Sequence, residues 1–509
     1  MFFGVFFDLL NSWGLSWTIL LALSCLAVFQ YLQSPANLPP GPWGWPVVGN
    51  LLSLRKATPL VLTEWAKEYG DIVSYRTGSE LRVVLNSYDV VREAFVKKFT
   101  IFSSRPKPLT SFIAQLKTKG IVSERYGPTW KDHRRFSMKS LRDFGSGKKS
   151  LEGKILEEAR ALVGRIAKRE HQEFSIDQMI QGALSNVIAS IAFGTRYEDN
   201  DPEFEALLSF IDETFSTSTL SLLPVFFPTL RYIPGVNSGL NRYDGIMSKV
   251  FKLFQDKIED HKKDFKQDYI RDFIDAFLLE KMNREGDENT TFTEEQLAMI
   301  VADMFFAGTD TTSTTLRWAL LYMILHPDIQ EKVQQEIDSV IGPNNDPSMM
   351  HRSETPYTAA ALAEVERLAT IAPLALPHAT TEETRLGGYN IPKGTIVEPN
   401  IWAIHHDPQL WPNPHEFDPT RFLDDRGKFV KREKLIPFSI GRRACLGEQL
   451  ARMELYLFLT SLLQRFSFKL AEGAPIPSGK GEFGLTHAPM SYKLVAIPRN
   501  YCAREYFGS

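Results

Sequence analysis

The chain has 509 residues, and its 58 lysines and arginines nearly balance its 61 aspartates and glutamates, which gives a formal net charge of −3. This balance offers no electrostatic reason to expect nucleic acid as a partner. The three cysteines, Cys25, Cys445 and Cys502, are too few for a disulfide framework in so long a chain. The body contains neither a Pro/Gly/Ser-rich linker nor an internal repeat that would divide it.

The first predicted element is an apolar segment from Leu15 to Leu32, which carries no charged residue. At 1.5 Å per residue, a helix of this length just crosses a hydrocarbon core about 30 Å thick. A cleaved secretory signal needs a charged start and an Ala-x-Ala-like site, and a mitochondrial presequence is rich in arginine. The chain has neither signature, because its only charge before Arg55 is Asp8. We therefore expect an uncleaved membrane anchor over residues 1–33.

A proline-rich hinge over residues 34–50 is predicted to follow the anchor. It contains the run Leu38-Pro-Pro-Gly-Pro-Trp-Gly-Trp-Pro46, whose prolines stiffen the backbone and cannot continue a helix. The body of the protein therefore begins at residue 51.

Patterns in the body predict many helices and few strands. Residues 72–86 indicate two short strands around Gly78, and residues 88–96 indicate a helix. Long helical patterns then dominate up to Gly342, which is predicted to end its helix as a C-terminal cap. Around residues 387–394 the pattern changes to hairpins and loops. The sequence therefore predicts a mainly α fold with a small β region.

One predicted helix combines an apolar background with an unusual number of polar residues. Thr293 and Gln296 form a predicted capping box at its start. Residues 301–315 within it read VADMFFAGTDTTSTT. Five threonines, a serine and two aspartates are costly to bury in one helix, so we expect some of them to be kept for function.

Cys445 lies in the run Phe438-Ser-Ile-Gly-Arg-Arg-Ala-Cys-Leu-Gly447, and residues 448–458 indicate a helix directly behind it. The amides and the positive dipole end of that helix favour an anion, so we expect Cys445 to stay deprotonated. A buried structural cysteine is the ordinary alternative. The run, however, resembles the haem-binding loop Phe-x-x-Gly-x-Arg-x-Cys-x-Gly of the cytochrome P-450 superfamily, and it matches every fixed position.

This resemblance implies the cytochrome P-450 fold, with a single catalytic domain over residues 51–509 behind the anchor and hinge. It implies that Cys445 binds the iron of haem b, because a thiolate ligand favours O–O cleavage of bound oxygen. The implied enzyme is a monooxygenase that inserts one oxygen atom into a lipophilic substrate. Because the chain has no Rossmann fingerprint of its own, electrons are expected from NADPH through a separate cytochrome P-450 reductase, with cytochrome b5 as a second candidate donor.

The segment Ala307-Gly-Thr-Asp-Thr-Thr312 matches the oxygen-binding motif of the superfamily at every position. The resemblance implies that Gly308 lets oxygen and substrate approach the helix backbone. It also implies that Asp310 relays protons from solvent and that Thr311 donates one to the oxygen. The alternative is that the threonine hydroxyls only bond back to the preceding turn.

Further residues are implied to hold the haem. Phe438 is expected beside the sulfur, and Gly441 and Gly447 are expected to let the backbone approach the porphyrin. A packed core histidine is an equal alternative for His378. The residues implied to contact a haem propionate are Trp130, Arg134 and Arg443, with Arg105 and His378 as weaker candidates.

Other constellations support the same family. Glu364 and Arg367 lie three residues apart on one helix and are implied to form a buried triad with Arg421, although Thr420 replaces a usual glutamate beside it. Asp303 is expected to satisfy nearby backbone amides, and the alternative is that it pairs with a cationic substrate. The residues expected to form a basic face for an acidic electron donor are Lys131, Arg135, Lys139, Arg142, Lys148, Lys149 and Arg442.

The branch of the superfamily follows from longer runs. GRRACLGEQLARMEL and TTSTTLRWALLYMILHPDIQEKVQQEID resemble microsomal family two, with features of its D, U and R subfamilies. The resemblance implies the endoplasmic reticulum membrane, a catalytic domain that faces the cytosol, and an apolar stretch at residues 220–234 that dips into the membrane. The expected substrate is a long-chain fatty acid, a sterol or secosteroid, or a xenobiotic. The alternatives are a haem-thiolate isomerase and a non-catalytic haem-binding protein.

Overall fold

The computed structural model describes residues 24–25, 35–54, 57–106, 119–144, 151–216, 235 and 238–499. Most of the expected anchor over residues 1–33 and the apolar stretch at 220–234 lie outside these ranges. Within them, no helix is both long enough and apolar enough to cross a membrane.

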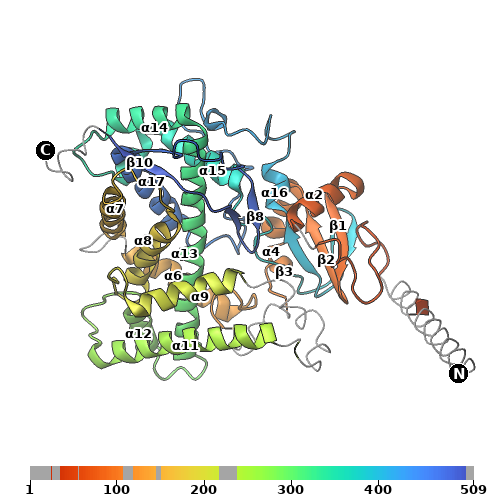
Figure 1. Cartoon of the computed structure of the whole chain (residues 1–509). Coiled ribbons are helices and arrows are strands. Elements are labelled where there is room, and N and C mark those ends of the chain that lie inside the picture. Colours follow the sequence, from red (N-terminus) through yellow and green to blue (C-terminus); the bar gives the residue numbers. More distant parts are fainter. Residues whose placement is uncertain are drawn as a thin grey trace, which may run out of the picture.

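Helices make up most of this part of the chain, and Figure 1 shows them gathered around one long central helix. The prediction of a mainly α fold with a small β region is confirmed. The α-helices are α2 (Thr58–Tyr69), α3 (Tyr88–Arg92), α4 (Phe99–Phe102), α6 (Pro128–Phe144), α7 (Leu151–Ala167), α8 (Asp177–Ala192), α9 (Pro202–Ser216), α11 (Ser238–Asp264), α12 (Phe273–Asn283), α13 (Glu294–Leu325), α14 (Pro327–Val340), α15 (Pro356–Ala369), α16 (Ile401–His405) and α17 (Glu448–Arg465). Short π- or 3-10 helices are η1 (Glu93–Lys97), η5 (Met349–Ser353) and η6 (Pro419–Phe422).

The largest sheet lies beside the helices and has the strand order β1-β2-β6-β3. Its first two strands, β1 (Ile72–Thr77) and β2 (Glu80–Leu85), are antiparallel and turn at Gly78, as predicted. β6 (Ile396–Pro399) pairs parallel to β2, and β3 (His378–Ala379) pairs antiparallel to β6. Three further antiparallel pairs join β4 (Thr384–Leu386) to β5 (Tyr389–Ile391), β7 (Phe466–Lys469) to β10 (Val495–Pro498), and β8 (Gly481–Phe483) to β9 (His487–Pro489).

The central helix α13 divides the hydrophobic core into two parts. Its first half, from Leu297 to Phe305, is buried against α8, α11 and α12. Its second half, from Leu316 to Ile324, is buried against α7, α8, α14, α15 and α17. The polar residues between these halves therefore lie in the middle of the molecule, which is where a reaction can be shielded from water.

The ends of three helices test the capping predictions made from the sequence. Thr293 Oγ1 accepts the Gln296 amide at 3.2 Å and caps α13, as predicted. The second half of the capping box was wrong, because the Gln296 side chain bonds both backbone groups of Gly120 instead. Gly342 has a φ of 77° and its amide bonds Ile337 O at 3.1 Å, which confirms it as the end of α14. The helix behind Cys445 is α17, which continues to Arg465 rather than residue 458.

Candidate haem-thiolate site

The loop that carries Cys445 is folded tightly against α17 and η1. The Cys445 amide donates to Phe438 O at 2.9 Å, and Gly447 is the N-cap of α17. Gly441 has a φ of 84°, and a Cβ there would lie 2.0 Å from Phe95 O. Only glycine fits this position, but the close approach is to the backbone of Phe95.

The Cys445 thiol combines two properties that ordinarily exclude each other. Its surface is exposed, yet desolvation by the surrounding protein raises its pKa. Both hold for a side chain that solvent reaches although protein atoms surround it. Amides of Gly447 and Glu448 and the charge of Arg134 lower the pKa, as the sequence led us to expect. Desolvation outweighs these groups in the protein alone, and a coordinated metal ion would favour the thiolate of such a cysteine.

Three buried or half-buried arginines lie beside this loop with little opposing charge. Arg443 donates to the carbonyls of Ser103 (2.8 Å), Ile121 (3.1 Å) and Glu124. Desolvation, followed by repulsion from Arg105 and Arg134, lowers the pKa of Arg443 to about 8. Desolvation also lowers the pKa of Arg105 to about 10 and that of Arg134. The cluster is therefore short of negative charge, which is the environment that suits the two carboxylates of a haem.

Trp130 and Arg134 lie one turn apart on α6, and both reach this cluster. The Trp130 indole N–H donates to Ile121 O at 3.2 Å, and the Arg443 guanidinium lies 4.1 Å from the centre of the Trp130 ring. Arg134 Nη2 donates to Ala444 O at 2.7 Å, next to the cysteine. Phe438 lies at the base of the loop, with the Arg452 guanidinium 4.8 Å from its ring. The structure thus brings Trp130, Arg134 and Arg443 together, with their donors occupied by backbone carbonyls.

His378 has a different environment. It is buried, its Nδ1 lies 2.7 Å from Phe102 O, and its ring stacks on Phe95 at 4.0 Å. Desolvation, and then the charges of Arg105 and Arg443, hold its pKa well below the usual value. A neutral packed histidine beside the arginine cluster is the alternative that these contacts favour.

The three residues predicted to manage oxygen and protons lie on α13. The Thr311 hydroxyl donates to Ala307 O at 2.7 Å, which is the back-bonding alternative. Asp310 Oδ2 accepts the Thr486 hydroxyl at 2.9 Å, and desolvation raises the Asp310 pKa. A Cβ at Gly308 would lie 2.6 Å from Ile188 Cδ1, so this glycine allows α13 to pack against α8, a role that the sequence did not indicate.

Asp303, two turns earlier on α13, binds backbone. Its Oδ2 accepts the amides of Ile121 at 2.7 Å and Val122 at 3.0 Å. Desolvation raises its pKa to about 6, and the two amides and Arg105 oppose that change. These contacts favour the role of satisfying backbone amides over that of binding a cationic substrate.

The family model for cytochrome P450 matches residues 39–496 of the chain. The chain belongs to the cytochrome P450 family. It is 42% identical over 492 residues to cytochrome P450 2U1 of Homo sapiens, covering 91% of this chain and 90% of that protein. It is also 42% identical to cytochrome P450 2D4 of Rattus norvegicus (91% and 93% covered) and to cytochrome P450 2J2 of Homo sapiens (93% and 94% covered). These equal identities confirm family two and leave the subfamily open.

Membership of the P450 family makes the chain a monooxygenase with haem b as its cofactor, and NADPH-derived electrons reach it through a reductase. The residues described above fit that group. The exposed, free Cys445 offers an iron ligand, and the arginine cluster offers partners for the propionates.

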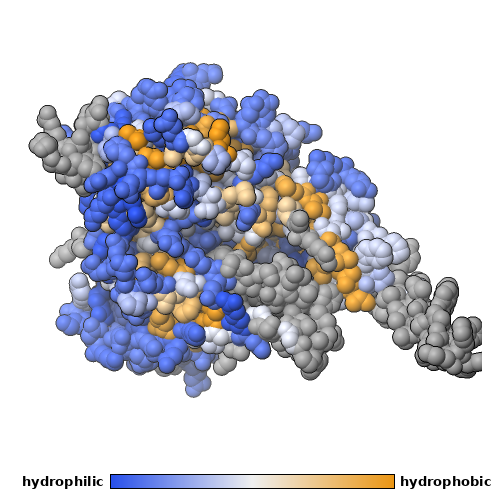
Figure 2. All heavy atoms as spheres, viewed as in Figure 1, coloured by the Kyte–Doolittle hydropathy of each residue, from blue (hydrophilic) through white to orange (hydrophobic). Residues whose placement is uncertain are grey.

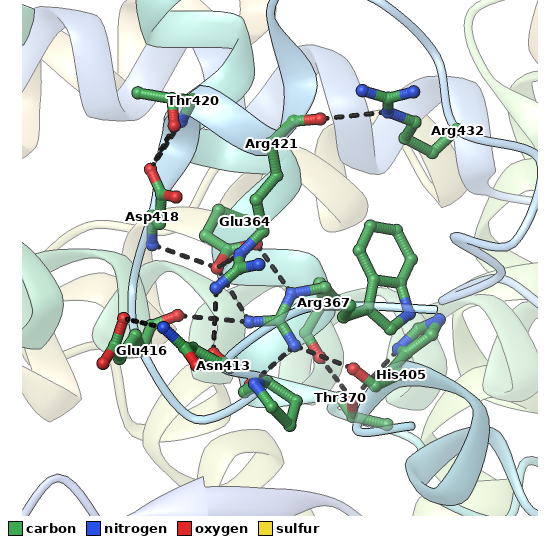
Figure 3. A network of polar contacts seen from close by, with 12 residues as sticks. Glu364, Arg367, Thr370, His405, Asn413, Glu416, Asp418, Thr420, Arg421 and Arg432 are labelled. Carbon is green, nitrogen blue, oxygen red and sulfur yellow. Dashed lines mark hydrogen bonds and ion pairs between the residues drawn. The ribbon is translucent and has the colours of Figure 1, made fainter. Parts of the chain in front are cut away.

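Figure 3 shows a network of polar contacts around Glu364 and Arg367. Both side chains of the Glu364–Arg367 pair are fully buried, and Arg367 donates to both Glu364 oxygens at 2.7 Å. Arg421 Nε reaches the same carboxylate at 3.2 Å, so the predicted triad is present. Thr420, in place of the usual glutamate, bonds Asp418, which caps η6.

His405 belongs to this network and was missed by the sequence analysis. Its Nε2 accepts the Ile436 amide at 2.9 Å, which fixes the proton on Nδ1, 3.0 Å from Thr370 Oγ1. The Thr370 hydroxyl donates in turn to Arg367 O. In the sequence, His405 between Ile404 and His406 carries no signal of this role, so only the fold reveals that it ties the triad to the start of the haem loop.

Proposed function

We propose that this P450 hydroxylates a lipophilic, uncharged or anionic substrate, with Cys445 as the thiolate ligand of the haem. The reaction balances as R–H + O2 + NADPH + H⁺ giving R–OH + H2O + NADP⁺. The observation that carries the proposal is an exposed Cys445 with a desolvated thiol, beside three arginines whose mutual repulsion lowers the Arg443 pKa. When bound, the haem supplies oxygen activation, and its thiolate ligand favours O–O cleavage.

The chain's own side chains would supply orientation and protons. Arg443, Arg134 and Trp130 would hold the propionates after exchanging backbone carbonyls for carboxylate oxygens, because charge-assisted hydrogen bonds are stronger than neutral ones. Asp310 would take protons from solvent and pass them toward Thr311. The Thr311 hydroxyl would donate to the reacting oxygen only after it releases Ala307 O.

The substrate class rests on the charges of α13. Asp303 accepts two amides and faces Arg105, so it has little capacity left for a substrate cation. Burying an unpaired ammonium group is very costly. We therefore place a long-chain fatty acid or a sterol-like lipid ahead of a basic amine.

A membrane location is supported by apolar side chains near the expected anchor. Trp43 and Trp45 in the hinge are 82% and 68% exposed, and Val47, Leu52 and Leu60 are exposed nearby. Figure 2 shows hydrophobic surface at the same end of the molecule as β1 and β2. Tryptophan favours the interface of a bilayer, so this end would rest on the endoplasmic reticulum membrane with the catalytic domain in the cytosol.

The reductase would dock on the basic face around the Cys445 loop. Lys131, Arg135 and Lys139 are exposed on α6, and Arg442 is exposed in the loop itself; Lys148 and Lys149 lie outside the described residues. Opposite charges raise association rates in a salt-dependent way, so an acidic donor suits this face. Cytochrome b5 would compete for it as a second donor.

The test is turnover of purified protein with NADPH, a microsomal reductase, and long-chain fatty acids, secosteroids and basic amines, with products identified by mass spectrometry. A hydroxylated lipid supports the proposal. Rearranged peroxides formed without reductase would instead indicate an isomerase, and haem binding with no NADPH consumption a non-catalytic protein. Cys445→Ala should lose the thiolate form of the reduced carbon-monoxide spectrum, with Cys25→Ala as the matched control; an unchanged spectrum would refute the ligand assignment.

A further inference from the structure

A hydrogen bond joins α13 to a turn that lies far from it in the sequence. Thr486 Oγ1 donates to Asp310 Oδ2 at 2.9 Å. Thr486 lies in the turn between β8 and β9, where the Gly484 amide bonds Thr486 O at 3.0 Å. Among the described residues, this is the hydrogen bond that the Asp310 carboxylate accepts. The acid assigned to proton transfer is therefore held by a hydroxyl from another element.

The β8–β9 hairpin is itself fastened to α13. The Trp318 indole N–H donates to His487 O at 2.9 Å, and the Tyr492 hydroxyl donates to Arg317 O at 2.7 Å. A Cβ on Gly481 would lie 2.6 Å from the Trp318 ring, so strand and helix touch. Arg317 and Trp318 lie about two turns after Asp310 on the same helix, and these contacts hold the segment that carries Thr486 against α13.

The charged groups near Asp310 cannot orient it as well as this hydroxyl does. Arg317, on α13, acts on Asp310 through charge alone, and its guanidinium is held by both oxygens of Asp177 at 2.7 and 3.0 Å. Asp212, on α9, repels the carboxylate. Thr486 supplies a directed bond, and a bond to a charged group is about twice as strong as a neutral one.

We propose that Thr486 is a positioning residue for proton delivery: it holds the Asp310 carboxylate in the orientation from which protons pass to the reacting oxygen. The inference rests on the proton-relay role of Asp310 in the proposed function. The β8–β9 hairpin would thereby affect the fraction of NADPH electrons that are used to form hydroxylated product.

The experiment compares Thr486→Val, which keeps the shape and removes the hydroxyl, with Thr486→Ser, which keeps the hydroxyl. Each is combined with Asp310→Asn. Variants are compared at equal content of thiolate haem, judged by the reduced carbon-monoxide spectrum. Two ratios are measured with NADPH and reductase: hydroxylated product per NADPH with oleate, and hydrogen peroxide per NADPH without any substrate. The solvent deuterium isotope effect on turnover is measured in parallel.

We expect Thr486→Val to lower the ratio of hydroxylated product to NADPH about tenfold, which corresponds to the loss of one hydrogen bond to a charged group. The hydrogen peroxide ratio and the solvent isotope effect should rise, and Thr486→Ser should restore all three quantities. Because Thr486 acts through Asp310, Thr486→Val should add nothing in the Asp310→Asn background.

Different results overturn different claims. Normal ratios in Thr486→Val, together with a defect in Asp310→Asn, would refute the inference and leave the relay intact. Normal ratios in Asp310→Asn would refute the relay in the proposed function, and the inference with it. Additive effects in the double variant would show that Thr486 acts by another route and would also refute the inference.

Discussion

Glu454 on α17 is a buried carboxyl group, and replacing it should increase the free energy of unfolding at neutral pH. It is 1% exposed, and its Oε1 has no hydrogen-bond partner in the described part of the chain. Desolvation raises its pKa from 4.5 to about 8, and the Thr312 side chain opposes this only in part. The folded protein therefore holds a proton there that the unfolded chain releases above about pH 4.5.

The sign and size of the effect follow from this difference. A raised carboxyl pKa in the folded state makes stability fall as pH rises from 4.5 toward 8. At 1.36 kcal/mol per pH unit, the cost is roughly 3 kcal/mol at pH 7 and roughly 4 kcal/mol at pH 8. Glu454→Gln keeps the shape without the titration. It should match the original protein near pH 4.5 and be more stable above it.

Thermal unfolding of the haem-loaded protein measures this. With an unfolding entropy of about 2.1 cal/mol/K per residue, a domain of this size gains roughly 1 °C in Tm per kcal/mol, so we expect about 3 °C at pH 7. Glu448→Gln, at a partly exposed glutamate six residues earlier on α17, is the matched control. A Tm difference that is independent of pH, or a less stable Glu454→Gln at pH 8, would refute the reasoning.

Three further predictions concern the site. Thr311→Ala should retain haem and the thiolate spectrum but lower product per NADPH about 100-fold, in the range expected for lost general acid catalysis, and full coupling would refute the assignment. Asp303→Ala should weaken fatty-acid and amine binding equally, because it releases the amides of Ile121 and Val122; a selective loss of amine affinity in binding titrations would show a substrate cation partner instead. His405→Leu should convert part of the reduced carbon-monoxide complex to the non-thiolate form, because it leaves the Ile436 amide without an acceptor, whereas His405→Gln should retain the thiolate form; equal spectra would refute this coupling.

The features predicted well from sequence depend on neighbouring residues. The strands around Gly78, the end of α14 at Gly342 and the cap at Thr293 each follow from turn or capping chemistry within a few residues. The Cys445 loop and the Glu364–Arg367 pair were predicted because their spacing matches a known family. The assignments of Cys445, Thr311 and Asp310 to catalysis remain predictions that the experiments above test.

The features missed depend on partners far along the chain. Gln296 could complete a local capping box, but it bonds Gly120, 176 residues away, because a buried backbone pair there needs partners. Gly308 was assigned to oxygen access, which remains a prediction, and the sequence did not reveal that its missing Cβ also makes room for Ile188. The local sequence gives no signal of either contact, because each depends on how elements far apart in the chain pack together.

Long-range contacts also support the proposed iron ligand and the proposed proton relay through different elements. α17 carries Cys445 just before its first turn, and α13 carries Asp310 and Thr311; the two helices pack against each other. Each is then held from outside by a separate element: His405 holds the loop before Cys445 through Ile436, and the β8–β9 hairpin holds Asp310 through Thr486. Because these supports are separate, loss of one should disturb ligation and loss of the other should disturb proton delivery. His405→Leu should therefore change the spectrum without raising the solvent isotope effect of the remaining thiolate form, and Thr486→Val should do the reverse.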